Sequence, residues 1–132
     1  MRLTLLALAA SSALTLANAQ SEGPAKEKVL RTVQNGLRTC SGVQKVQREG
    51  SLFRLYDGAF LREFDLDDMS SFSFELGLSL NCEALGCVTN SLPSVENDGS
   101  WKEMGAQNSV ALQCYGAASK IDEAIRYYRE NF

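Results

Sequence analysis

The residues with the clearest chemistry in this chain are its four cysteines, Cys40, Cys82, Cys87 and Cys114. In an exported protein an even number of cysteines predicts disulfides. Cys82 and Cys87 do not have the Cys-x-x-Cys spacing of a thioredoxin-like redox pair. Four cysteines allow three pairings. We favour Cys82–Cys87 across a turn, because antiparallel neighbours lie within bridging range, and Cys40–Cys114 between the first helix and the last strand.

The chain contains no histidine. This excludes Ser-His and Cys-His nucleophile pairs, most zinc sites and acid–base chemistry by imidazole. The sequence also lacks a glycine-rich phosphate-binding loop. Two carboxylates could hydrolyse a glycoside, but carboxylates are too common on surfaces to be specific evidence. We therefore predict a non-catalytic protein with no metal or other cofactor, and a small carboxylate-dependent hydrolase as the alternative.

Glu63, Asp65, Asp67 and Asp68 form an acidic cluster. An EF-hand calcium loop needs a glycine at its sixth position, and counting from Asp65 places Ser70 there. The calcium pattern therefore fails. We interpret the cluster as a solvated connection in which Asp68 or Ser70 caps a turn.

The single tryptophan, Trp101, lies in the stretch with the weakest pattern, residues 91–104. A loop of this length in a small domain is often functional or mobile. Trp101 is either a core residue or an exposed anchor, and exposed tryptophans contribute strongly to interfaces. The predicted partner-binding surface is Trp101 together with Asp65, Asp67 and Asp68.

Residues 1–19 have the features of a secretory signal peptide. Arg2 is followed by an uncharged apolar run over residues 3–16 and by a small-x-small cleavage site at Ala17-Asn18-Ala19. The run is shorter than the roughly 20 residues that a membrane span needs. We predict one exported domain over residues 20–132 with no membrane span after cleavage. It would be periplasmic in a bacterium, which the character of the chain favours, or extracellular in a eukaryote.

The predicted mature chain is acidic, with 12 Lys and Arg residues against 16 Asp and Glu and a net charge of −4. Nucleic-acid binding requires concentrated Lys and Arg, so we exclude nucleic acid as a partner. The expected partner is a protein or a component of the cell envelope.

The centre of the predicted sheet is residues 72–82, where alternate residues are apolar: Phe72, Phe74, Leu76, Leu78, Leu80 and Cys82. This alternation predicts one antiparallel strand with one buried face, bent or bulged at Gly77. Burial would make Phe74→Ala cost about 3–5 kcal/mol. The alternative is two strands with a turn at Leu76-Gly77, a poor turn dipeptide.

Asp57-Gly58 between apolar runs predicts a two-residue hairpin turn that sets Leu55 opposite Phe60 and Phe53 opposite Arg62. Further strands are expected over residues 43–47, 87–89 and 108–114. Helical periodicity predicts a first helix over residues 24–40 and a last helix that begins near a capping box, Ser119-x-x-Asp122.

These elements predict an α+β fold: an antiparallel sheet of five or six strands, with an N-terminal and a C-terminal helix and disulfide bracing. The alternative is a strongly curled, barrel-like sheet plugged by the C-terminal helix. The residues expected to point inward are Phe53, Leu55, Phe60, Phe72, Phe74, Leu76, Leu78, Leu80, Val110, Leu112, Ile121 and Ile125.

Several of these patterns together resemble small exported bacterial proteins of unknown function, over about residues 59–130. The matching parts are Phe-Asp-Leu-Asp-Asp-Met (64–69), the alternating strand with Leu-Ser-Leu-Asn-Cys (78–82), Cys87-Val88 and the last helix. The resemblance implies export and brings no known active site. A sheet closed by a C-terminal helix is also similar to pleckstrin-homology-like domains, although the N-terminal helix departs from that pattern.

By elimination, the sequence predicts a non-catalytic exported domain that binds another macromolecule. The small, acidic, disulfide-bearing chain is also similar in character to immunity proteins of bacterial antagonism systems. The main alternative within binding is therefore an immunity or inhibitor protein whose acidic side covers the basic cleft of a cell-wall-acting enzyme.

Overall fold

The computed structural model describes residues 23–94 and 99–132, so the predicted signal peptide lies outside the described residues. The described part begins with helical residues 23–37 and ends with the helix α2 (Ala118–Asn131). Between them lie the strands β1 (Lys45–Glu49), β2 (Leu52–Asp57), β3 (Phe60–Asp65), β4 (Met69–Phe74), β5 (Gly77–Cys82), β6 (Val88–Pro93), β7 (Trp101–Gln107) and β8 (Ser109–Leu112).

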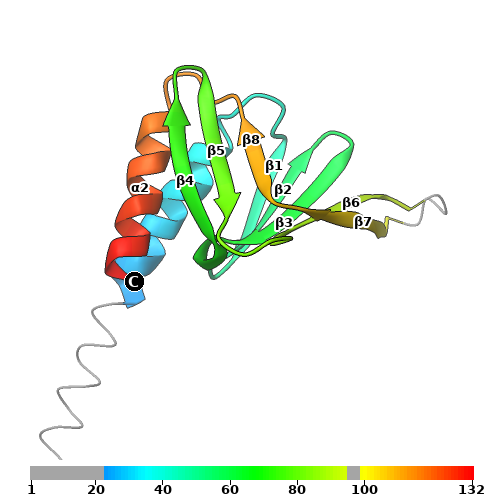
Figure 1. Cartoon of the computed structure of the whole chain (residues 1–132), viewed down its shortest axis with the longest axis horizontal. Helices are drawn as coiled ribbons and strands as arrows, with labels where there is room; N and C mark the ends of the chain where they lie inside the picture. The colour runs from blue at the N-terminus through cyan, green and yellow to red at the C-terminus, as the bar shows by residue number, and fades with distance from the viewer. Residues whose placement is uncertain (1–22, 95–98) are drawn as a thin grey trace, which may run out of the picture.

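The strands form two sheets that are the halves of one bent antiparallel meander. The first sheet has the order β1-β2-β3-β6-β7 and the second β4-β5-β8. β3 leads into β4 through a short 3₁₀ helix (Leu66–Asp68), β5 into β6 through the Cys82–Cys87 turn, and β7 into β8 at Asn108. The chain thus passes three times between the two sheets (Figure 1). The predicted α+β class, with a helix at each end, is confirmed, and the sheet is strongly curled.

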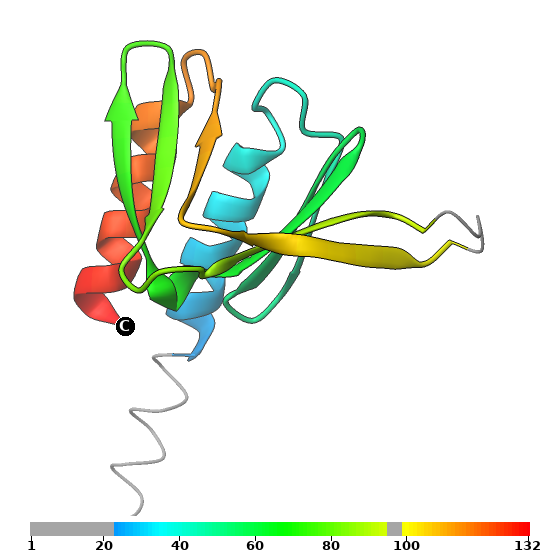
Figure 2. The same ribbon diagram turned by 45° about the vertical axis from the view of Figure 1, so that its right-hand side comes forward.

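Both helices pack on the concave side of the bent sheet and lie side by side (Figure 2). Gly36 permits their close approach, because a Cβ atom there would lie 2.5 Å from Ile121 Cγ1. The core beneath them is formed by apolar side chains from both helices and both sheets, among them Leu30, Val33, Leu37, Phe53, Leu55, Phe64, Leu78, Leu80, Val110, Ile121, Ile125 and Tyr128. This apolar burial is the main stabilising contribution to the fold.

The predicted single strand over residues 72–82 is wrong. The chain turns at Glu75-Leu76, so that Phe74 of β4 pairs with Gly77 of β5. A Cβ atom on Gly77 would lie 2.3 Å from the carbonyl oxygen of Leu112, so only glycine fits this approach to β8. Two strands therefore replace the expected bend.

The inward face of β4 carries Ser71 and Ser73 beside the buried Met69, whereas the prediction placed Phe72 and Phe74 inward. Ser71 and Ser73 point toward α2 and donate hydrogen bonds to the buried carboxylate of Asp122, at 2.6 and 3.4 Å. Phe72 and Phe74, together with Leu76 in the turn, are exposed instead. A buried carboxylate needs hydrogen-bond donors, and this need decides which face of β4 turns inward.

The predicted capping box of the last helix is also wrong. Asp122 faces β4 and pairs with Arg126 one turn later, at 3.2 Å. The N-cap is Ala117, which makes no side-chain capping bond. The burial of the apolar face of α2 stabilises this helix without a cap.

The β2–β3 hairpin turns one residue later than predicted, at Gly58-Ala59. This register places Leu55 opposite Arg62 and Asp57 opposite Phe60. Phe60 lies at the end of the hairpin and is exposed rather than buried. The positive φ of Gly58 (+63°) fits the first position of such a turn.

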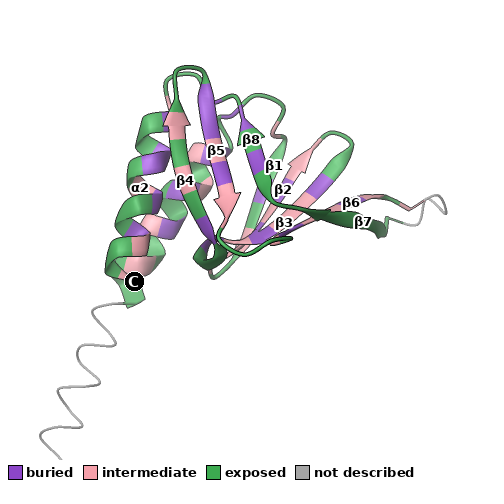
Figure 3. Cartoon of the chain, in the orientation of Figure 1, coloured by how far each residue is buried: buried purple, intermediate pink, exposed green. Residues whose placement is uncertain are grey.

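Residues 91–104 are more regular than predicted, because β6 extends to Pro93 and β7 begins at Trp101. The β6–β7 hairpin projects from the body of the domain, and every residue of β7 is exposed (Figure 3). The register shifts between Asn90 and Ser91, which marks a bulge. Residues 95–98 lie outside the described residues.

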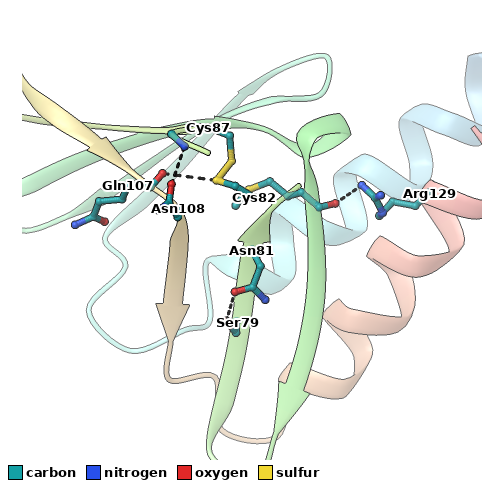
Figure 4. Close-up of a disulfide and its surroundings, with 9 residues drawn as sticks. Ser79, Asn81, Cys82, Cys87, Gln107, Asn108 and Arg129 are labelled. Atoms are coloured by element: carbon teal, nitrogen blue, oxygen red, sulfur yellow. Dashed lines mark hydrogen bonds between the residues drawn. A yellow bond between two sulfur atoms is a disulfide. The ribbon is translucent and has the colours of Figure 1, made fainter. Parts of the chain in front are cut away.

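Both predicted disulfides are confirmed. Cys40–Cys114 joins the end of the first helical segment to the chain that follows β8. Cys82–Cys87 closes the turn at the bend of the sheet, where the Gly86 amide donates to Asn108 Oδ1 at 2.7 Å (Figure 4).

Candidate binding surface

The outer face of the five-stranded sheet is the face opposite the two helices. Because side chains alternate across a strand and paired residues share a face, the register places one row of residues there. This row runs from Lys45 through Tyr56, Leu61 and Ser91 to Glu103. Trp101 lies two residues before Glu103 on the same strand and therefore on the same face. Neither described helix covers this face (Figure 2).

An aromatic pair connects β2 with the edge strand β7 on this outer face. The rings of Trp101 and Tyr56 meet edge to face with centroids 5.6 Å apart, and Lys45 Nζ lies 5.4 Å from the Tyr56 centroid. Leu61 is only 5% exposed on a face that no helix covers, so neighbouring side chains shield it. Trp101 itself is 37% exposed. Trp101 is therefore held in place by a neighbour and still available for contact.

Charged residues of both signs share the outer face with the aromatic pair. Arg54 and Glu63 form an ion pair across β2 and β3, with Nε and Oε2 3.2 Å apart. The register adds Glu49 and Asp65 to the same face, on either side of Leu52. Together with Glu103, these residues give the outer face an acidic excess over Lys45 and Arg54.

The acidic residues predicted from sequence mainly organise the bend between β3 and β4. Asp65 caps the 3₁₀ helix by accepting from the Asp67 amide at 3.0 Å, in place of the predicted Asp68 or Ser70. Asp67 accepts from the hydroxyls of Tyr128 and Ser51. Of the predicted acidic residues, the register thus assigns Asp65 to the outer face with Trp101, whereas Asp67 bonds to α2.

Because of Tyr128, we expect the free energy of unfolding to fall at high pH. Burial, reinforced by the hydrogen bond to Asp67, raises the pKa of its phenol well above the ordinary value. Stability is therefore complete below the pKa of an unfolded tyrosine, about 10, and falls above it by about 1.4 kcal/mol per pH unit, since only the unfolded chain ionises. Urea unfolding between pH 9 and 11.5 should show this slope reduced in Tyr128→Phe. An equal slope in the wild type and in Tyr128→Phe would contradict the assignment of this pH dependence to Tyr128.

Tyr56, Lys45 and Leu61 were missed by the sequence analysis. The contact of Tyr56 with Trp101 depends on the β3–β6 and β6–β7 pairings, which join residues far apart in the chain. The alternation within each strand was visible. The pairing that places β7 in the same sheet as the β2–β3 hairpin was not visible, because residues 91–104 carry little strand pattern.

A concave feature, which we call the β8 cleft, lies on the other side of the same sheet. It consists of two adjoining hollows of about 540 and 490 Å³ that share Arg62 and Ala111. Asp57 is the one carboxylate residue among those lining the two hollows. Glycoside hydrolysis uses two carboxylates, so the cleft does not supply the pair that a hydrolase of this kind needs.

Within residues 23–94 and 99–132, no three side chains of the metal-binding types gather into a group that could hold an ion. Over the same residues, neither helix combines the length and apolar character that crossing a membrane requires. Comparisons of the chain with protein-family models, with curated proteins and with solved structures found no match.

Proposed function

We propose that this chain is a non-catalytic exported domain that binds a protein partner through the outer face of its five-stranded sheet. The observation that carries the proposal is Trp101, which is partly exposed and braced by Tyr56 on an uncovered sheet face. Tryptophan and tyrosine bury large areas while losing little side-chain freedom, and they dominate interface energetics.

The position of Trp101 in the sheet should keep the entropic cost of binding low. Paired strands of one sheet position both aromatic residues, so little chain has to be ordered when a partner arrives. Aromatic residues are enriched at protein interfaces, and charged residues usually lie at their rim. The acidic excess of the outer face favours a partner with a basic surface and thereby supports the inhibitor alternative.

The disulfides support export. Two disulfides brace a domain of modest size, and such bonds persist in oxidising compartments such as the periplasm or the extracellular space. The predicted signal peptide points to the same location.

Trp101→Ala should weaken capture of the partner by about 30-fold, the effect of losing an interface residue worth about 2 kcal/mol. The measurement is a pull-down from periplasmic extract or culture medium, followed by titration of the captured protein. Tyr127→Ala is the matched control, because Tyr127 is an exposed aromatic residue on α2, away from this sheet.

Equal affinity of Trp101→Ala and Tyr127→Ala for the captured protein would overturn the proposed surface. Turnover of cell-wall fragments that one Asp or Glu substitution abolishes, without unfolding the protein, would overturn the non-catalytic proposal. A captured enzyme that is inhibited on binding would instead identify the domain as an inhibitor.

A further inference from the structure

We propose that the β8 cleft is a second binding site, separate from the outer face, and that it takes an extended peptide segment of a partner protein. The segment would add to the free edge of β8 as a further strand. Main-chain hydrogen bonds then provide affinity, as in other cases of strand addition.

β8 has one free edge. In the described residues it pairs with β5 alone. The Asn108 carbonyl accepts from the Cys82 amide at 2.8 Å on the β5 side, whereas the Gln113 carbonyl accepts from the Ser41 amide at 2.7 Å on the opposite side. Backbone groups alternate between the two sides of an antiparallel strand. The N–H and C=O groups of Ser109 and Ala111 therefore point away from β5, as those of Gln113 do.

The opposite wall of the cleft contains a polar cluster with unused hydrogen-bonding capacity. Arg62 Nη1 lies 3.1 Å from Asp57 Oδ2, and the guanidinium lies 5.9 Å from the centre of the Phe60 ring. Asn90 is paired with Arg62 across β3 and β6. The buried atoms Arg62 Nε, Asp57 Oδ1 and Asn90 Oδ1 have no hydrogen-bond partner within the described part of the chain.

Arg62 and Asp57 line the cleft, whereas Asn90 does not, so the first two residues set the chemistry that the cleft can accept. Arg62 Nε needs an acceptor, and Asp57 Oδ1 needs a donor. A buried polar atom without a partner costs about 1–3 kcal/mol, so a ligand that supplies both kinds of group is favoured. A peptide backbone offers donors and acceptors along its length and can satisfy the β8 edge together with this cluster.

The dimensions of the cleft suit a short extended segment. Residues 109–112 along its edge correspond to about 14 Å of strand. The Cys40–Cys114 disulfide follows Gln113 at one end, and the Cys82–Cys87 turn lies beside Asn108 at the other. Both ends are thus covalently braced, which lowers the cost of ordering the site on binding.

The edge of β8 also lacks charged side chains, which are one of the protections against strand addition. The edge strand β1 carries Lys45, Arg48 and Glu49, and β7 carries Lys102 and Glu103. Charged side chains on an edge discourage pairing with another chain. β8 consists of Ser-Val-Ala-Leu and has none.

Panning a random-peptide library against the mature, disulfide-bonded protein tests this proposal. Enriched peptides should slow amide hydrogen exchange at Ser109 and Ala111. Ala111→Pro should weaken their binding at least tenfold, because proline removes a donor from the free edge and leaves the bonds to β5 in place. Ala111→Thr keeps the amide and should bind as the wild type does, and Trp101→Ala should also retain binding.

Methylation of alternate backbone nitrogens in an enriched peptide should abolish its binding, and this variant does not depend on the folding of Ala111→Pro. The proposal is overturned if no peptide is enriched over a surface without the protein. It is also overturned if the methylated peptides still bind, or if binding is lost in Trp101→Ala but retained in Ala111→Pro. These outcomes leave the partner of the outer face unaffected, so the two proposals fail separately.

Discussion

Removal of the Cys40–Cys114 disulfide, by Cys40→Ala with Cys114→Ala, is expected to lower the free energy of unfolding by about 4–5 kcal/mol. The two cysteines are 74 residues apart, so the bond closes most of the described chain into one loop and restricts the unfolded state strongly. Domains of this kind are stable by about 5–15 kcal/mol in total. Urea unfolding of the mature protein should therefore show a large fall, or no folded state at 37 °C.

The second disulfide provides the matched control. Cys82 and Cys87 are only 5 residues apart, so Cys82→Ala with Cys87→Ala should cost about 2 kcal/mol. Equal losses for the two double variants, or a loss below about 2 kcal/mol for the long loop, would contradict the loop-length explanation. Both cysteines of the long loop are buried in the core, so the cavity left by their sulfur atoms adds to the cost.

The parts of the fold that depend on local pattern could be predicted from the sequence. Apolar residues at helical spacing located both helices. The turn around Gly58 located the β2–β3 hairpin to within one residue. The disulfides followed from the same order of elements, since Cys82 and Cys87 flank a turn. Local periodicity and turn chemistry act over a few residues and are visible without any tertiary contact.

The orientation of β4 could not be predicted, because a distant residue decides it. Alternation shows that Phe72 and Phe74 share one face and Ser71 and Ser73 the other, but not which face is buried. The decision comes from Asp122, 51 positions after Ser71, whose buried carboxylate takes the serine hydroxyls. An apolar-inside rule necessarily chooses the wrong face where a buried carboxylate requires donors.

The candidate sites show the same division between local and distant information. Trp101 stood out in the sequence because it is the single tryptophan beside a weak pattern. Tyr56 could not be connected with it before the strand order was known. The β8 cleft is less visible still, because Arg62 and Ala111 are brought together only by the bend of the sheet. Such sites depend on topology, which short sequence patterns do not encode.

Phe64→Ala is expected to lower the free energy of unfolding by about 3–5 kcal/mol, whereas Phe74→Ala should cost less than about 1 kcal/mol. Phe64 is 1% exposed, and its ring stacks on that of Phe53 with centroids 5.7 Å apart. Its truncation leaves a cavity between the sheet and the helices. Phe74 is 44% exposed on the outward face of β4, where truncation removes mainly surface that water already reaches.

Urea unfolding of the two variants under the same conditions tests which description of β4 is right, that of the structure or that of the simple sequence alternation. The alternation predicts a large loss for Phe74→Ala, because it places Phe74 inside the core. The structure predicts a large loss for Phe64→Ala alone, since Ser71 and Ser73 occupy the inward side of β4. A loss above about 3 kcal/mol for Phe74→Ala would mean that β4 turns its phenylalanines inward and that Asp122 lacks its serine donors.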